Sequence, residues 1–115
     1  MEVFPPKFAE VYNSQWGTFA ERIAPRIKQF YEGLPIAEHE RSIFDLCCGT
    51  GQLAHYFLKH GYRVIGSDLS EAMLKHARTN NRSYISSGQA LFFQADAAAF
   101  ELDEQVGLVV ATGEA

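Results

Sequence analysis

The spacing of hydrophobic positions divides the chain into two parts. In residues 7–33, apolar side chains recur at three- and four-residue intervals, which predicts helices. From Ser42 onward, short continuous apolar runs alternate with stretches that keep the helical spacing. We therefore predict a helical cap over residues 1–41 and an α/β core over residues 42–115.

The core shows the order of elements expected of a parallel α/β sheet. Strands are predicted where an apolar run ends in a turn, and helices where helical spacing follows a turn or a capping residue. The predicted strands are 42–47, 63–68, 90–95 and 107–112, and the predicted helices are 52–60 and 70–79. The polar residues 80–88 predict a loop. Strands that alternate with helices in this way favour a parallel sheet with flanking helices.

The last apolar run lies close to the end of the sequence. Residues 108–111 are as apolar as a central strand buried on both faces, yet only residues 112–115 follow them. An uncovered apolar edge strand promotes association. We therefore expect that the chain is a fragment of a longer domain, or that another chain covers this strand, for example through self-association.

Composition and charge narrow the classes of function. The 115 residues are 47% hydrophobic and 21% charged, which is typical of a soluble globular domain, and no apolar run approaches the roughly 18 residues of a membrane span. The first residues lack the basic and apolar segments of a secretory signal, so we expect a cytoplasmic protein. A formal net charge of −4 argues against nucleic acid as a partner, because such binding needs clustered Lys and Arg.

The cysteines and histidines do not suggest a metal site. The two cysteines, Cys47 and Cys48, are adjacent, and successive strand residues point to opposite faces, which disfavours a disulfide between them. The four histidines show no ligand spacing with the cysteines. We expect neither a bound metal nor a disulfide.

Candidate binding residues gather where the first two predicted strands end. Gly49 and Gly51 form a turn between a strand and a helix, where backbone N–H groups can approach a ligand closely. Asp68 ends the next strand, about 20 residues after Gly49, which is the spacing of nucleoside-binding α/β units. These residues indicate a nucleoside site at this edge of the sheet.

Three interpretations of the turn are open. The glycines can simply permit a tight turn, but Asp45 then lies unpaired in a buried strand, at a cost on the order of several kcal/mol. Gly49-x-Gly51-x-x-Ala54 also fits the fingerprint of dinucleotide-binding domains, although Asp45 would repel a pyrophosphate over the turn. In the third interpretation the ligand is a nucleoside that carries a cationic amino acid. The sign of the charge favours this last one.

Four segments in order resemble the motifs of the class I S-adenosylmethionine-dependent methyltransferases. Residues 43–51 (IFDLCCGTG) resemble motif I, which commonly reads as two hydrophobic residues followed by D-x-G-x-G-x-G. Residues 64–74 (VIGSDLSEAML), 92–97 (FFQADA) and 108–111 (LVVA) are similar to the motifs of the second, third and fourth strands. The resemblance implies a Rossmann-like α/β fold, with a parallel sheet and flanking helices, preceded by a helical cap.

The resemblance implies that the methionine and ribose of S-adenosylmethionine lie over the first two strands. Asp45, Gly49 and Gly51 would hold the methionine end, where the cofactor carries an ammonium and a sulfonium, and Asp68 would bind the ribose hydroxyls. Cys47 departs from the family, because it replaces the first glycine of motif I. We interpret Cys47 as a small apolar lining residue, since no partner base that would activate a thiolate is in view.

The resemblance places the adenine beside residues of the second and third strands. Leu69 and Met73 would pack against its ring, Asp96 would accept a hydrogen bond from its amino group, and Ala97 would offer a backbone N–H to a ring nitrogen. Plain core packing remains an alternative for Met73, and a loop-start aspartate remains one for Asp96.

The implied function is that of an S-adenosylmethionine-dependent methyltransferase, or of the N-terminal cofactor-binding fragment of one, acting on a small-molecule methyl acceptor. No catalytic residue can be named. Tyr12 and Trp16 either close over the cofactor as an aromatic lid or belong to the core of the cap. The alternatives are an NAD-type dinucleotide-binding oxidoreductase domain and a non-catalytic nucleoside-binding module.

Overall fold

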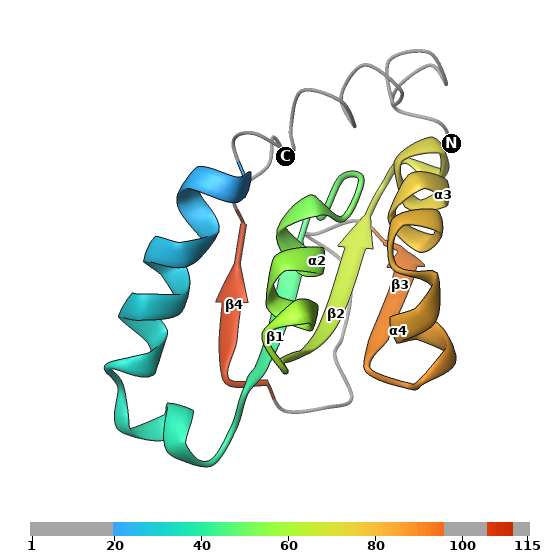
Figure 1. Ribbon diagram of the computed structural model, residues 1–115. Coiled ribbons are helices and arrows are strands. Elements are labelled where there is room, and N and C mark those ends of the chain that lie inside the picture. Colours follow the sequence, from blue (N-terminus) through green and yellow to red (C-terminus); the bar gives the residue numbers. More distant parts are fainter. Residues whose placement is uncertain (1–19, 96–105, 112–115) are drawn as a thin grey trace.

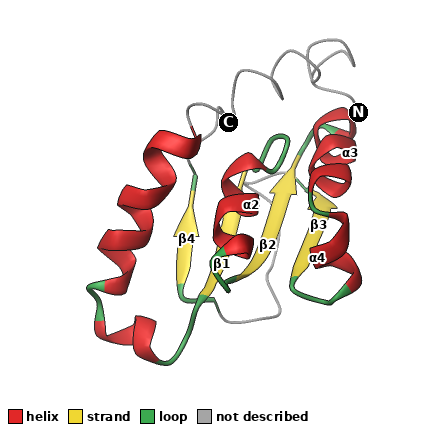
Figure 2. Cartoon of the chain, viewed as in Figure 1, coloured by secondary structure: helices red, strands yellow, loops and turns green. Residues whose placement is uncertain are grey.

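The computed structural model describes residues 20–95 and 106–111, which form one parallel sheet with helices packed against it (Figure 1). The strands are β1 (Ser42–Leu46), β2 (Arg63–Asp68), β3 (Ala90–Gln94) and β4 (Leu108–Val110). They are hydrogen-bonded in the order β3-β2-β1-β4, and each pair is parallel (Figure 2). The predicted parallel α/β fold is confirmed.

The helices follow the strands as the sequence predicts. They are α2 (Gln52–Lys59), α3 (Glu71–Asn80) and α4 (Arg82–Ser86), with a short 3₁₀ helix, η1 (Pro35–Glu38), and a helix over residues 20–32 before β1. In Figure 1, α2 and α3 lie in front of the sheet, and the helix of residues 20–32 lies beside β4. None of the helices in the described part of the chain is long and apolar enough to cross a membrane.

Strand alternation sends one set of side chains into the core beneath these helices. Ile43, Val64 and Phe92 share a face of the sheet and belong to one buried hydrophobic cluster. The helices complete this cluster with their own buried residues, which are Ala20, Ala24, Tyr31, Leu53, Ala54, Phe57, Leu58, Leu74 and Ala77. The layer of helices therefore covers one face of β1, β2 and β3.

Local chemistry explains where the two long crossover helices begin. Gly51 caps α2 in a left-handed conformation, with φ of 78°. Ser70 caps α3, because its hydroxyl oxygen accepts a hydrogen bond from the backbone N–H of Met73. Both helices lie within one or two residues of their predicted bounds. The loop predicted for residues 80–88 is wrong in part, because α4 occupies its centre.

Strand β4 lies at one edge of the sheet. It pairs with β1 through Ile43 and Leu108, Phe44 and Val109, and Asp45 and Val110. Val109 keeps 53% of its surface exposed, on the face of the sheet opposite the helices described above. The expectation that another chain covers this strand stays a prediction.

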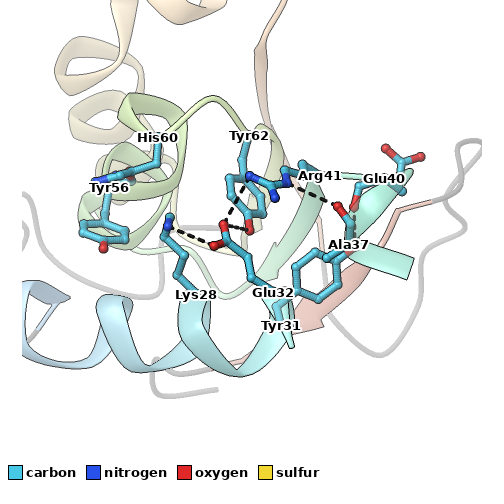
Figure 3. Close-up of polar contacts among 9 residues, drawn as sticks. All are labelled: Lys28, Tyr31, Glu32, Ala37, Glu40, Arg41, Tyr56, His60 and Tyr62. Carbon is cyan, nitrogen blue, oxygen red and sulfur yellow. Dashed lines mark hydrogen bonds and ion pairs between the residues drawn. The ribbon is translucent and has the colours of Figure 1, made fainter. Parts of the chain in front are cut away.

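A polar cluster ties the helix of residues 20–32 to the amino end of the sheet (Figure 3). The Glu32 carboxylate accepts a hydrogen bond from the Tyr62 hydroxyl at 2.8 Å and forms ion pairs with Lys28 at 3.1 Å and Arg41 at 3.4 Å. Beside it, the Tyr31 hydroxyl donates to the backbone carbonyl of Glu40. These contacts hold the helix at the amino end of the sheet, and the glycine turn lies at the opposite, carboxyl end.

Candidate functional site

The turn after β1 has the unusual backbone that its glycines permit. Gly49 and Gly51 have φ of 58° and 78°, and Cys47, with φ of 57°, is also left-handed although it is not a glycine. The turn lies at the carboxyl ends of β1 and β2, where ligands bind in open α/β sheets. The predicted turn therefore lies where a nucleoside site is expected in a sheet of this kind.

Hydrogen bonds fix the turn against the next strand. The Cys48 N–H donates to the Ser67 carbonyl at 2.8 Å, and the Gly51 N–H donates to the Cys48 carbonyl at 3.1 Å. The Gly49 N–H donates to Oδ2 of Asp68 at 2.9 Å. Strand β2 thus holds the turn through both its backbone and its terminal carboxylate.

Asp68 joins the turn to the start of α3. Its Oδ2 accepts from Gly49, and its Oδ1 accepts from the Ser70 N–H at 2.9 Å. A carboxylate oxygen has two lone pairs, so each oxygen keeps one acceptor site beyond these bonds. The carboxylate is therefore held rigidly by two backbone groups and retains the capacity to bind two hydroxyls.

Asp45 is a buried carboxyl group with an unmet polar atom. It is 2% exposed, and its Oδ1 has no hydrogen-bond partner among the residues that the structure describes. Burial is the larger cause, and the negative charge of Asp68 the smaller one, of a rise in the pKa of this carboxyl to about 8. The prediction that Asp45 lies in a buried strand is thus confirmed.

Two further buried oxygens near Asp45 lack partners within the described part of the chain. They are the hydroxyls of Thr50, in the turn, and Ser67, near the end of β2. Buried polar groups are nearly always paired, so orphaned ones call for a ligand, an ion or a water. Asp45 is the ionisable member of the three, and a cation is the partner that best offsets the cost of burying its carboxylate form.

The predicted adenine-contacting residues differ in exposure. Leu69 is 42% exposed at the end of β2, so its side chain is accessible to a ligand. Met73 is 1% exposed in the first turn of α3, which leaves the two interpretations of this residue open. Asp96 and Ala97 lie outside the described residues, and so do Tyr12 and Trp16.

The two cysteines of the turn differ in burial. Cys48 is buried, and burial raises the pKa of its thiol well above the usual range. Cys47 is half-buried. Across residues 20–95 and 106–111, no three His, Cys, Asp or Glu side chains come together as metal ligands.

Sequence reasoning missed a group of side chains behind the turn. Asn80 and Asn81, at the end of α3, donate hydrogen bonds to the carbonyls of Thr50 and Gly51, and His55 bonds to Asn81. In the sequence the two asparagines mark only the start of a predicted loop. Their partners lie thirty residues earlier, and no local pattern connects the two segments.

Comparison with known proteins gives consistent matches. The model of a family described as a methyltransferase domain matches residues 43–114. The chain is 43% identical over 51 residues to the "Putative methyltransferase YqeM" of Bacillus subtilis (strain 168). These residues make up 44% of this chain and 19% of that protein. The match therefore spans about a fifth of the relative's length.

Solved structures of similar fold include enzymes of the same kind. A SAM-dependent methyltransferase from Thiobacillus denitrificans, in complex with S-adenosyl-L-homocysteine, superposes with a TM-score of 0.58 at 28% identity over 65% of this chain and 31% of that one. A TehB-like SAM-dependent methyltransferase from Corynebacterium glutamicum gives a TM-score of 0.69 at 23% identity over 95% of this chain and 56% of that one. The second match bears on the fold alone.

Proposed function

Because this chain belongs to the methyltransferase domain family, we propose that it binds S-adenosylmethionine and that the whole protein transfers the cofactor's methyl group to an acceptor. Asp45 is the observation that carries the proposal. A buried carboxyl group with an orphaned oxygen beside the glycine turn is costly alone and favourable next to a cation. The methionine end of this cofactor supplies an ammonium and a sulfonium.

The geometry of Asp68 supports binding of the ribose. Backbone N–H groups of Gly49 and Ser70 hold its two oxygens, and each oxygen keeps one lone pair for a hydroxyl. The exposed side chain of Leu69 can cover one side of the adenine. We retain Met73, Asp96 and Ala97 as further proposed contacts of the adenine.

The proposed reaction requires positioning more than proton transfer. S-adenosylmethionine supplies a methyl group already activated by its sulfonium: an acceptor atom forms a bond to the methyl carbon, the S–C bond breaks, and its electrons return to sulfur in S-adenosylhomocysteine. The chain contributes a fixed turn and two carboxylates that hold the donor in one orientation. We propose a small-molecule acceptor, because the net charge of −4 does not favour nucleic acid.

An NAD-type dinucleotide domain is the alternative that shares the glycine turn. Its pyrophosphate would lie over the turn, near the two acidic side chains of Asp45 and Asp68, which argues against it. Calorimetric titration of the chain with S-adenosylhomocysteine and with NAD separates the two functions. Binding of NAD without binding of S-adenosylhomocysteine would reject our proposal.

A pair of variants tests the two carboxylates separately. Asp45→Asn removes the charge proposed to meet the ammonium, so it should weaken binding of S-adenosylhomocysteine about tenfold at pH 8, which is the worth of a charge-assisted hydrogen bond. It should leave methylthioadenosine, which has no amino acid, almost unchanged. Asp68→Asn, the matched control, should weaken both ligands, because both contain the ribose.

The contrast between the ligands decides the roles. Equal losses of both ligands in Asp45→Asn would show that Asp45 supports the turn and does not meet the ammonium. Unchanged affinity of both ligands in Asp68→Asn would remove the ribose assignment.

A further inference from the structure

The C-terminal end of α3 is bonded directly to the glycine turn. Asn81 is 0% exposed, and its Nδ2 donates to the Gly51 carbonyl at 3.3 Å and to the Ala77 carbonyl at 2.9 Å. Both amide hydrogens are therefore used, and its Oδ1 must accept from Nδ1 of His55, at 2.9 Å. Both amide hydrogens and the carbonyl oxygen of the Asn81 side chain therefore have hydrogen-bond partners within the protein.

Asn80 extends the same contact by one peptide. Its Nδ2 donates to the Thr50 carbonyl at 2.9 Å. Since a peptide unit is planar, holding the carbonyls of Thr50 and Gly51 also sets the orientation of the N–H groups that follow them. The two asparagines thus fix two successive peptide planes of the turn from the side of α3.

Packing between α3 and Gly51 leaves no room for a side chain at position 51. A Cβ at Gly51 would lie 2.8 Å from Nδ2 of Asn81 and 3.0 Å from Cβ of Ala77. Gly51 is therefore needed here because α3 approaches the turn closely, in addition to its left-handed φ of 78°. The position of α3 therefore determines where the glycine turn lies.

We propose that Asn81, assisted by Asn80, is a positioning residue of the cofactor site, which holds the glycine turn in its ligand-binding conformation before the ligand arrives. The proposal rests on the proposed binding of S-adenosylmethionine. A turn that is already ordered loses little conformational entropy when it binds, and this preorganisation appears as affinity. Asn81 itself need not touch the ligand.

The experiment compares Asn81→Ala with a matched amide elsewhere in the fold. Gln89→Ala is the control, because Gln89 also donates from its Nε2 to two backbone carbonyls, those of Leu58 and Tyr62, at the opposite end of the sheet. The affinity for S-adenosylhomocysteine is measured by calorimetry on the folded fraction of each protein. Asn81→Ala should weaken binding about tenfold, and Gln89→Ala should leave it within about twofold of the wild type.

A second measurement does not depend on the ligand. Nuclear magnetic resonance relaxation of the ligand-free chain should give backbone order parameters near 0.85 for Gly49, Thr50 and Gly51 in the wild type and clearly lower values in Asn81→Ala. Gln89→Ala should keep the wild-type values. If Asn81→Ala does not fold, Asn80→Ala, which removes the bond to the Thr50 carbonyl, should show the same changes at smaller size.

The outcomes separate the two proposals. Wild-type affinity in Asn81→Ala, or an equal loss in Gln89→Ala, would overturn the role of Asn81. If the wild type binds no S-adenosylhomocysteine, the proposed function fails, and the relaxation data alone then decide whether Asn81 orders the turn. If the backbone amides of the turn are as rigid in Asn81→Ala as in the wild type, the ordering role of Asn81 is rejected as well.

Discussion

Cys47 occupies a backbone conformation that usually belongs to glycine. Its φ of 57° lies in the left-handed region, where a Cβ crowds the following carbonyl. This conformation gives a physical reason for the glycine that the related motif carries at this position. Cysteine has an unbranched side chain and is among the smaller residues, so it can be accommodated there at moderate cost.

Substitutions at Cys47 should therefore depend on branching at Cβ. Cys47→Gly relieves the crowding but adds freedom to the unfolded chain, so the free energy of unfolding should stay within about 1 kcal/mol of the wild type. Cys47→Val places a β-branched side chain at positive φ and should lower it by about 2 kcal/mol. Urea unfolding measures both, and Cys47→Ala, unbranched, serves as the control. Equal stability of the valine and alanine variants would contradict this explanation.

At the residue scale, the sequence was sufficient to identify the two aspartates of the candidate site but not the two asparagines behind the turn. Asp45 and Asp68 could be singled out because each lies in an apolar strand beside a turn, where an acidic residue is costly. Asn80 and Asn81 lie in a polar segment where any residue would be unremarkable. Their importance depends on tertiary contacts with Thr50 and Gly51, which local spacing does not encode.

At the scale of elements, the helix of residues 20–32 packs closely against Gly107, the residue that precedes β4. A Cβ at Gly107 would overlap the Tyr31 hydroxyl oxygen and would lie 3.2 Å from the Glu40 carbonyl oxygen. The Gly107 N–H also donates to the Ser42 carbonyl at 3.1 Å. The first helix and the edge strand are therefore packed around one small residue.

Gly107→Ala should lower the free energy of unfolding by about 2 kcal/mol, because the added methyl group must displace Tyr31 or the strand. Tyr31→Phe in the same chain should restore part of the loss, since it removes the atom nearest to the new methyl. Gly33→Ala is the control, because its Cβ would meet nothing nearer than 3.4 Å. Thermal or urea unfolding gives the comparison, and equal effects at Gly33 and Gly107 would refute it.

Long periodic elements were predictable and the short one was not. The bounds of β1, β2, α2 and α3 follow from apolar spacing and from turn and capping residues, because those features act locally. Helix α4 has only five residues, of which only Tyr84 and Ile85 are hydrophobic, so its sequence is too short to show a helical pattern and reads as a loop. It forms after α3 because the N–H groups of Tyr84 and Ile85 both donate to the Asn81 carbonyl.

At the scale of the whole molecule, the buried Asp45 links global stability to pH. Its pKa is about 8 in the folded protein and near 3.8 when the chain is unfolded. Between these values the folded state holds a proton that the unfolded state has lost, so this group's contribution to stability falls as pH rises from about 4 to about 8. The usual trend for a paired carboxylate is the opposite.

Urea unfolding of the wild type and of Asp45→Asn across pH 5 to 9 should reveal this linkage. The variant should gain stability relative to the wild type as pH rises, because it has no proton to lose. Binding of S-adenosylhomocysteine to the wild type should strengthen over the same range, since its ammonium favours the ionised carboxylate. A stability difference that does not change with pH would show that Asp45 is ionised throughout.

The hydrogen bonds behind the glycine turn also bear on the order of folding. They connect residues 19 and 30 positions apart, whereas the bond that joins Gly107 to the Ser42 hydroxyl spans 65 positions. Short loops close at a smaller entropic cost and tend to form first. During synthesis, the turn, Asp68 and the end of α3 can therefore assemble as soon as Asn81 has emerged from the ribosome. The β1–β2 side of the nucleoside site can then assemble before the edge strand β4 has emerged.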